Sequence, residues 1–217
     1  MARPTKVVGC KTLFPYGRAN AIAVRTYRTK HFIPPGATNL RLVHVNSYLE
    51  TAPSVAETNT GNAIVLKCGL EDSLGTITPV TWGGSPTKSI AQGATATSDP
   101  VVVTVAPGGY VWVRCCVTVG AGEWYPTGWT THSGDGEGTF DGDRAHSGAI
   151  GTSTVVGVYP LAILGTPTSE CPTVAILGDS IAQGTRDYLW RSGYPVGGGW
   201  FVRALDGVMP FTQFGQS

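Results

Sequence analysis

The chain has 217 residues, of which 41% are hydrophobic and 13% are charged, so its composition excludes a disordered chain. A formal net charge of +1 argues against a general nucleic-acid binder. The 30 glycines and 15 prolines show no repeat period and favour many short strands joined by turns over long helices.

The N-terminal segment through Arg18 lacks the apolar core of a signal peptide. No apolar run approaches the ~20 residues that span a bilayer, so we expect a soluble protein without a membrane partner. No acid precedes Glu50, whereas eight lysines and arginines do: Arg3, Lys6, Lys11, Arg18, Arg25, Arg28, Lys30 and Arg41. This basic segment indicates either a solvated or subunit-facing surface or contact with an anionic partner such as an acidic neighbouring subunit.

Residues 1–165 read as an all-β unit. Its candidate strands are 21–28, 39–47, 62–69, 76–82, 100–105, 109–119 and 152–160. The clearest is 109–119, where Val111, Val113 and Cys115 fall on one face while Trp112 and Arg114 fall on the other. Pro-Gly pairs at 35–36 and 107–108 mark turns. We therefore expect a β-sandwich of jelly-roll type, with a closed barrel as the alternative.

The five cysteines are odd in number and show no CxxC spacing, so we expect reduced thiols that pack as small hydrophobes. His44 alternates with Leu40 and Leu42, which favours a histidine at the edge of the core over a metal ligand. The aromatic residues form either a sugar-stacking surface or a packing interface, and they are Trp82, Trp112, Trp124, Tyr125 and Trp129.

The loop 132–146 is rich in glycine and acid, and His132 and His146 flank it. Its carboxylates are Asp135, Glu137, Asp141 and Asp143. Calcium is the cofactor that such a loop would hold, because hard cations take several oxygen ligands on a flexible backbone. The spacing is not that of an EF-hand, so a solvated loop without a metal is the main expectation, and a two-histidine metal site is a further alternative.

The pattern changes after a polar stretch that we interpret as a linker, residues 166–172. Residues 173–177 are continuously apolar, which is typical of a buried parallel strand. A helix is expected over 200–205 and a second strand over 210–214, so residues 173–217 predict the opening of an α/β domain.

The sequence Gly178-Asp179-Ser180 follows the apolar strand, and Gly184 follows four residues later. A serine at the carboxyl end of a parallel strand lies where α/β folds place their ligands. Backbone N–H groups at the start of a helix there can hold the oxyanion that forms when a hydroxyl attacks an ester. Asp179 and Ser180 could equally serve only as a helix N-cap.

Residues 174–184 resemble the first conserved block of the SGNH/GDSL serine hydrolase family, and 211–217 resemble its second block. The resemblance covers about 45 residues. It implies that Ser180 is the nucleophile and first oxyanion donor, that Gly215 is the second donor, and that Gly178, Asp179 and Gly184 support the motif. The 1–165 region also resembles, loosely, the β-rich modules that precede this domain in some bacterial and phage-like esterases.

The family also needs an Asn block and a C-terminal Asp-x-x-His pair, which do not occur after residue 184. We therefore expect the chain to be the N-terminal portion of an ester hydrolase, truncated and inactive alone, acting on an ester or acylated carbohydrate such as a deacetylase substrate. The alternative is a structural or carbohydrate-binding β-sandwich protein, for example a virion or assembly component, with a remnant hydrolase segment. A homo-oligomer or larger assembly is compatible with both interpretations.

Overall fold

The computed structural model describes residues 3–9, 15, 17–20, 22–49, 57–129, 135–154, 156–178 and 199–215. Strands dominate these residues, so the prediction of a mainly β protein is confirmed. Among the described residues no helix is long and apolar enough to cross a membrane.

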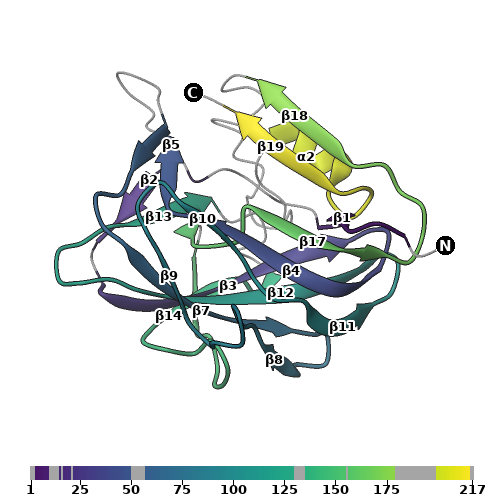
Figure 1. Cartoon of the computed structure of the whole chain (residues 1–217). Coiled ribbons are helices and arrows are strands. Elements are labelled where there is room, and N and C mark those ends of the chain that lie inside the picture. Colours follow the sequence, from purple (N-terminus) through teal and green to yellow (C-terminus); the bar gives the residue numbers. More distant parts are fainter. Residues whose placement is uncertain are drawn as a thin grey trace.

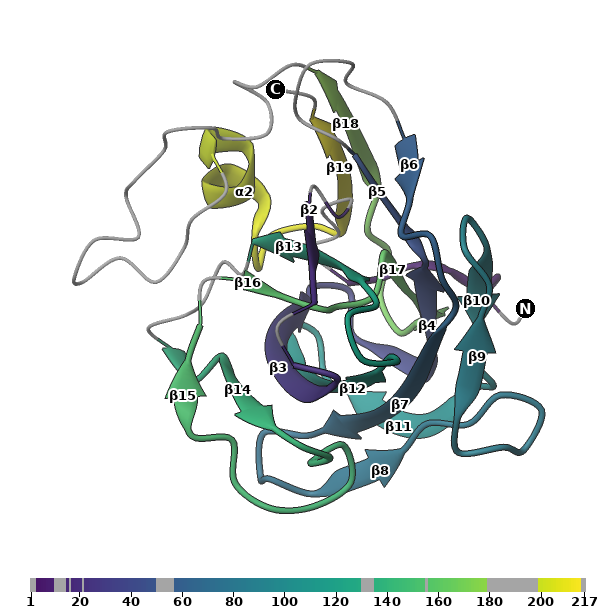
Figure 2. The same cartoon turned by 90° about the vertical axis from the view of Figure 1, so that its left-hand side faces the viewer.

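Two antiparallel sheets make up the body of the molecule (Figures 1 and 2). The first contains β1 (Lys6–Val7), β17 (Ala162–Pro167), β4 (Ala37–Val45), β10 (Thr95–Thr97) and β11 (Val101–Val105), with β10 and β11 both pairing β4. The second runs through β15 (Thr152–Ser153), β14 (Gly138–Asp141), β3 (Val24–Ile33), β12 (Gly109–Thr118), β7 (Ile64–Glu71) and β8 (Ile77–Pro79), and β9 (Lys88–Ile90) also pairs β7.

Smaller elements surround this body. Strands β16 (Val156–Gly157), β13 (Tyr125–Trp129) and β2 (Gly17–Ala19) form one small sheet, and β5 (Ser47–Leu49) pairs with β6 (Glu57–Asn59). After β17 come β18 (Val174–Gly178), α2 (Gly199–Leu205) and β19 (Phe211–Gly215), where β18 and β19 pair in parallel.

The core lies between the two sheets because alternate residues of each strand point inward. Val111, Val113 and Cys115 of β12 are at most 2% exposed and pack in one cluster with Leu40 and Leu42 of β4. The alternation read from residues 109–119 is therefore confirmed, and Cys115 and Cys116 face opposite sides as expected. Gly36 and Gly108 adopt positive φ angles of 60° and 75°, which explains glycine at both predicted Pro-Gly turns.

The outer face of β12 is also buried, which its alternation did not predict. Trp112 and Arg114 point away from the core yet are only 7% and 6% exposed. Residues 135–148, here called the acidic strap, cover this face: Arg114 Nη1 donates to the carbonyl oxygens of Arg144 and Gly148 at 3.1 and 2.7 Å. A sheet face that reads as polar in sequence is thus an interior surface.

Glu71 of β7 lies at the centre of this covered face. Its carboxylate accepts two hydrogen bonds from Arg28 of β3, at 2.7 and 2.9 Å, and one from Arg114 of β12 at 2.6 Å. Burial alone would raise the pKa of Glu71, but the hydrogen bonds and positive charges of Arg28 and Arg114 outweigh it and hold the pKa below its ordinary value. The triad of Glu71, Arg28 and Arg114 joins three adjacent strands, β7, β3 and β12, through one ionised carboxylate.

Some boundaries differ from those expected. Residues 165–167, expected at or beyond the end of the β unit, belong to β17, which pairs antiparallel with β4 and β1. Gly165 and Pro167 are buried there, whereas Thr166 between them is only partly buried. The strand expected at 152–160 is two short strands, β15 and β16, that pair with different partners. Short strands such as β9, β10 and β14 were not predicted, because two to four residues carry too little periodicity.

Replacing Glu71 with Gln should destabilise the protein strongly. The variant leaves the buried guanidinium of Arg114 and the partly buried guanidinium of Arg28 without a counter-charge. Such a loss typically costs about 3–5 kcal/mol and lowers the Tm by roughly 10 °C for a chain of this size. Asp143→Asn is the matched control, because Asp143 pairs with Lys67 at 2.7 Å but is 42% exposed, so its loss should cost no more than ~1 kcal/mol.

The lowered pKa of Glu71 also predicts how the free energy of unfolding depends on pH in wild type and in Glu71→Gln. Because the folded pKa of Glu71 is lowered, its contribution is present above the unfolded value of ~4.3 and is lost as pH falls through the folded pKa. Urea unfolding measured across this acidic range should show a shallower pH slope for Glu71→Gln than for wild type. Equal slopes and equal Tm values would contradict the role assigned to the triad.

Residues 1–172 should fold without the segment that follows. Among the described residues, the main core cluster has no member beyond Ile163, and Ile176, Val202 and Phe211 form a separate cluster. Circular dichroism of the 1–172 polypeptide should show a β spectrum and one cooperative melting transition. A gradual melt, with the full chain melting cooperatively under the same conditions, would show that the second cluster is needed to fold the first.

Candidate functional site

The strands β18 and β19 and the helix α2 form a β-α-β unit at one end of the molecule (Figure 1). Its core consists of Ile176, Val202 and Phe211, which are 5%, 0% and 0% exposed. Phe32 at the end of β3 packs against this cluster and connects the unit to the second sheet. The helix closes with Gly207 at φ 76°, the left-handed residue that commonly follows a helix C-terminus. The elements expected over 173–177, 200–205 and 210–214 are thus present.

The register of the parallel pair brings two glycines of the motif together. Gly178 at the end of β18 lies opposite Gly215 at the end of β19. The chain segments that leave the two strands therefore start from the same edge of the sheet. At this edge of a parallel sheet, two adjacent backbones can present N–H groups to one ligand.

Some of the site residues that were predicted from the sequence lie among the described residues, and others do not. Gly178 and Gly215 are described and are adjacent, whereas Asp179, Ser180 and Gly184 lie outside the described residues. Gly178 is exposed, so the edge that leads to Ser180 is accessible to solvent.

The expectation that this strand is buried on both faces is wrong for the described chain. Ile176 points into the small core, but Leu177 on the opposite face is 77% exposed. The reason is that one layer, α2 with Phe32, covers the pair on one side, and none of the described residues covers Leu177. Only one face of the apolar run at residues 173–177 is therefore covered by described residues.

His146, which an Asp-x-x-His spacing links to Asp143, does not belong to this site. Its Nε2 lies 2.9 Å from the carbonyl oxygen of Cys68 on β7, and Asp143 pairs with Lys67 of the same strand. Both views place the loop after β14 at the end of the molecule opposite to β18 and β19 (Figures 1 and 2). His132 lies outside the described residues.

The acidic strap uses its carboxylates to pair with cations of the N-terminal half. Asp135 pairs with Lys30, Asp141 with Arg25 at 2.7 Å, and Asp143 with Lys67 at 2.7 Å. Glu137 is 2% exposed and accepts a hydrogen bond from the backbone N–H of Lys30 at 2.9 Å. The four carboxylates thus bind Arg25, Lys67 and two different groups of Lys30, and among the described residues no carboxylate belongs to a group of three or more clustered ligand atoms.

Four of the eight basic residues in the N-terminal segment also pair with acids of the chain. Arg25, Arg28 and Lys30 pair with acids of the strap and of β7, and Arg3 pairs with Glu170 at 3.3 Å. Part of the uneven charge along the sequence is therefore balanced within the fold by these ion pairs.

The aromatic residues pack inside the protein. Trp82 and Trp112 are each 7% exposed and Tyr125 is 0% exposed. Trp124 is partly buried beneath Arg18, whose guanidinium carbon lies 4.2 Å from the ring centroid. These four residues therefore pack within the chain itself, and the side chain of Trp129 is outside the described residues.

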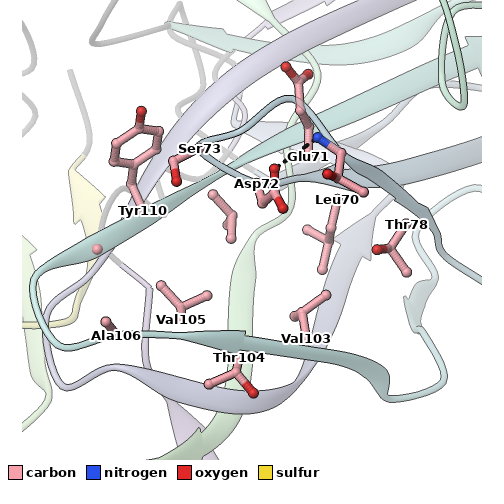
Figure 3. A pocket seen from close by; sticks show the side chains of 13 residues that line it. Leu70, Glu71, Asp72, Ser73, Thr78, Val103, Thr104, Val105, Ala106 and Tyr110 are labelled. Carbon is pink, nitrogen blue, oxygen red and sulfur yellow. Dashed lines mark hydrogen bonds between the residues drawn. The ribbon is translucent and has the colours of Figure 1, made fainter.

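A hollow of about 430 Å³ opens between the β7–β8 and β11–β12 turns (Figure 3). Leu70, Val103 and Val105 give it an apolar floor, while Asp72 and Ser73 lie at its rim. The Asp72 carboxylate already has hydrogen-bond partners in its own turn. Its Oδ1 accepts hydrogen bonds from the N–H groups of Leu74 and Thr76 at 2.9 and 2.8 Å. The described residues that line the hollow include no histidine, and the Glu71 carboxylate is hydrogen-bonded to Arg28 and Arg114.

Calcium should leave the Tm of the protein unchanged. The strap carboxylates already bind Lys30, Arg25 and Lys67, and displacing these cations offers little net gain. Thermal melts in millimolar calcium chloride and in sodium chloride of the same ionic strength should coincide. A Tm increase specific to calcium, lost in Asp141→Asn, would restore the calcium interpretation of the loop.

Comparison with known proteins does not assign a function to the sheet edge at Gly178 and Gly215. No protein-family model matches the chain, and no curated protein matches it in sequence.

Proposed function

We propose that the chain is the N-terminal portion of an SGNH/GDSL-type serine ester hydrolase, in which a jelly-roll-like β-sandwich module precedes the opening of the α/β hydrolase domain. The element order β18, α2, β19 and the parallel pairing of the two strands support this proposal. Two antiparallel sheets that share one core support the sandwich module.

The observation that carries the proposal is the pairing of Gly178 with Gly215. Ser180 follows Gly178 by two residues, so its hydroxyl and N–H would start from the same sheet edge as the N–H of Gly215. Two backbone donors at one edge suit an oxyanion, since such donors stabilise charge that develops during attack on a carbonyl.

The proposed reaction is the transfer of an acyl group from an ester to Ser180 and then to water. The Ser180 Oγ attacks the carbonyl carbon while a base takes its proton, and the tetrahedral intermediate expels the alcohol, which receives that proton. Water then hydrolyses the acyl-serine, releases the acid and restores the hydroxyl. The N–H groups of Ser180 and Gly215 would hold the oxyanion in both steps.

We propose that the base for this reaction lies outside the described residues. Of the described histidines, His31 lies 2.9 Å from Thr29 Oγ1 in the interior, His44 lies in the main core, and His146 bonds the Cys68 carbonyl. The proposed substrate is an ester, with acylated carbohydrate as the class to test first.

The test compares p-nitrophenyl acetate hydrolysis by the 217-residue chain with that by the polypeptide of the complete reading frame, each as wild type and as the Ser180→Ala variant. The complete polypeptide should hydrolyse the ester, and Ser180→Ala should reduce its rate by at least about a thousandfold, because the nucleophile acts as a unit with its base. If the reading frame extends beyond Ser217, the 217-residue chain should stay near background.

Ser73→Ala is the matched control, because Ser73 is a serine at the rim of the hollow and not at the glycine edge. Its activity should equal that of wild type. Hydrolysis that survives Ser180→Ala would show that the nucleophile is elsewhere, and loss in Ser73→Ala would direct attention to the hollow. Absence of any Ser180-dependent hydrolysis in the complete polypeptide would favour the non-catalytic binding or assembly role.

A further inference from the structure

Three side chains that can bind metal converge in the main core, remote from the proposed hydrolase edge. They are His44 of β4, Cys68 of β7 and Cys115 of β12, with exposures of 1%, 0% and 0%. His44 belongs to the first sheet and the two cysteines to the second. The cluster therefore lies where the two sheets face each other.

Strand register explains why the three meet. Cys68 and Cys115 are directly opposite each other in the antiparallel pair of β7 and β12, so their side chains lie side by side on the inward face. His44 occupies the inward face of β4 with Leu40 and Leu42, and its ring reaches across the core. Their ligand atoms come from positions 24 and 47 residues apart in the chain.

The distances suit a single metal ion. Cys68 Sγ and Cys115 Sγ are 3.4 Å apart, and His44 Nε2 lies 3.7 and 3.8 Å from them. A triangle with these sides has its equidistant point about 2.1 Å from each atom, close to the zinc–nitrogen distance of ~2.0–2.1 Å and slightly short of the zinc–sulfur distance of ~2.3 Å. A small ion on or just above the plane of the three atoms would reach all of them.

The ligand set selects the kind of ion. Two thiolates and an imidazole are soft to intermediate donors, which favour Zn²⁺ or Cu⁺ over calcium, magnesium or manganese. With Zn²⁺ the two thiolates give a site of zero net charge, which a dry core tolerates best. With Cu⁺ three ligands are a complete set. Both ions are d¹⁰ cations that bind without redox change.

We propose that His44, Cys68 and Cys115 bind one thiophilic d¹⁰ cation, Zn²⁺ or Cu⁺, which joins the two sheets. The competing explanation is that two thiols and an imidazole pack and share S–H hydrogen bonds. Zinc binds cysteine as the thiolate, so each of the two thiols releases its proton to solvent when the ion binds.

The experiment loads the reduced, metal-free full chain with Zn²⁺ or Cu⁺ in separate arms and measures bound metal after dialysis. The expected result is one equivalent per chain in at least one arm, with two protons released per Zn²⁺. Chelation should then lower the Tm by roughly 5–10 °C when the free metal had been present at a hundred times its Kd. The arm that binds identifies the ion.

Cys68→Ala, Cys115→Ala and His44→Ala should each lose the metal and the chelator-sensitive part of the Tm. Cys116→Ala is the matched control, because Cys116 is the next residue of β12 and is 3% exposed but faces the outer side. It should retain the full equivalent. A wild-type X-ray absorption spectrum, which needs no variant to fold, should show a shell of two sulfurs and one nitrogen.

Three outcomes would overturn the proposal: no binding in either arm, equal metal content in Cys68→Ala and wild type, or a Cys68–Cys115 disulfide in the protein as purified from cells. None of them bears on the hydrolase proposal, which rests on Ser180 and is tested without these residues.

Discussion

The carboxylate of Glu71, held between Arg28 and Arg114, is the interaction on which the body of this fold depends. It lets β12 be buried on both faces by two different kinds of chemistry. The inward face is apolar and gains from removal of its surface from water. The outward face is polar and can be covered only because each buried charge has an opposite charge and a hydrogen-bond partner. The acidic strap completes this arrangement.

The covered face also supports the proposed hydrolase edge. Lys30 lies 4.4 Å from the ring centroid of Tyr110, and Tyr110 makes an edge contact with Phe32 at a centroid distance of 6.0 Å. Phe32 in turn packs against the small core of Ile176, Val202 and Phe211. A continuous row of side chains therefore runs from the strap to the β-α-β unit. The unit is small, and its exposed Leu177 shows that its second face has room for further packing.

The two proposed sites use backbone register in different ways. At the edge of β18 and β19, register aligns Gly178 with Gly215, and the chemistry would come from N–H groups and from the residues that follow. In the main core, register aligns Cys68 with Cys115, and the chemistry comes from side chains that face His44 across the sheets. The first arrangement is suited to a reaction with solvent access, and the second to a structural ion in a closed interior.

The sequence alone determined the mainly β character, the two faces of 109–119, the Pro-Gly turns, and the strand, helix and strand after residue 173. These are local properties, because the two-residue alternation of a strand, the glycine of a turn and an apolar run each depend only on residues that are adjacent in the sequence. It also placed Gly178 and Gly215 directly after these two strands.

Only the tertiary structure decided which strands pair and what covers them. The acids at 135–143 read as a solvated loop with calcium as the alternative. The basic N-terminal residues read as a solvated or partner-facing surface. Sequence does not show that the two segments face each other. For the same reason, Trp112 read as part of either a sugar-stacking surface or a packing interface. His44, Cys68 and Cys115 gave no metal spacing, since their meeting depends on register and on sheet packing between distant segments, which no local pattern encodes.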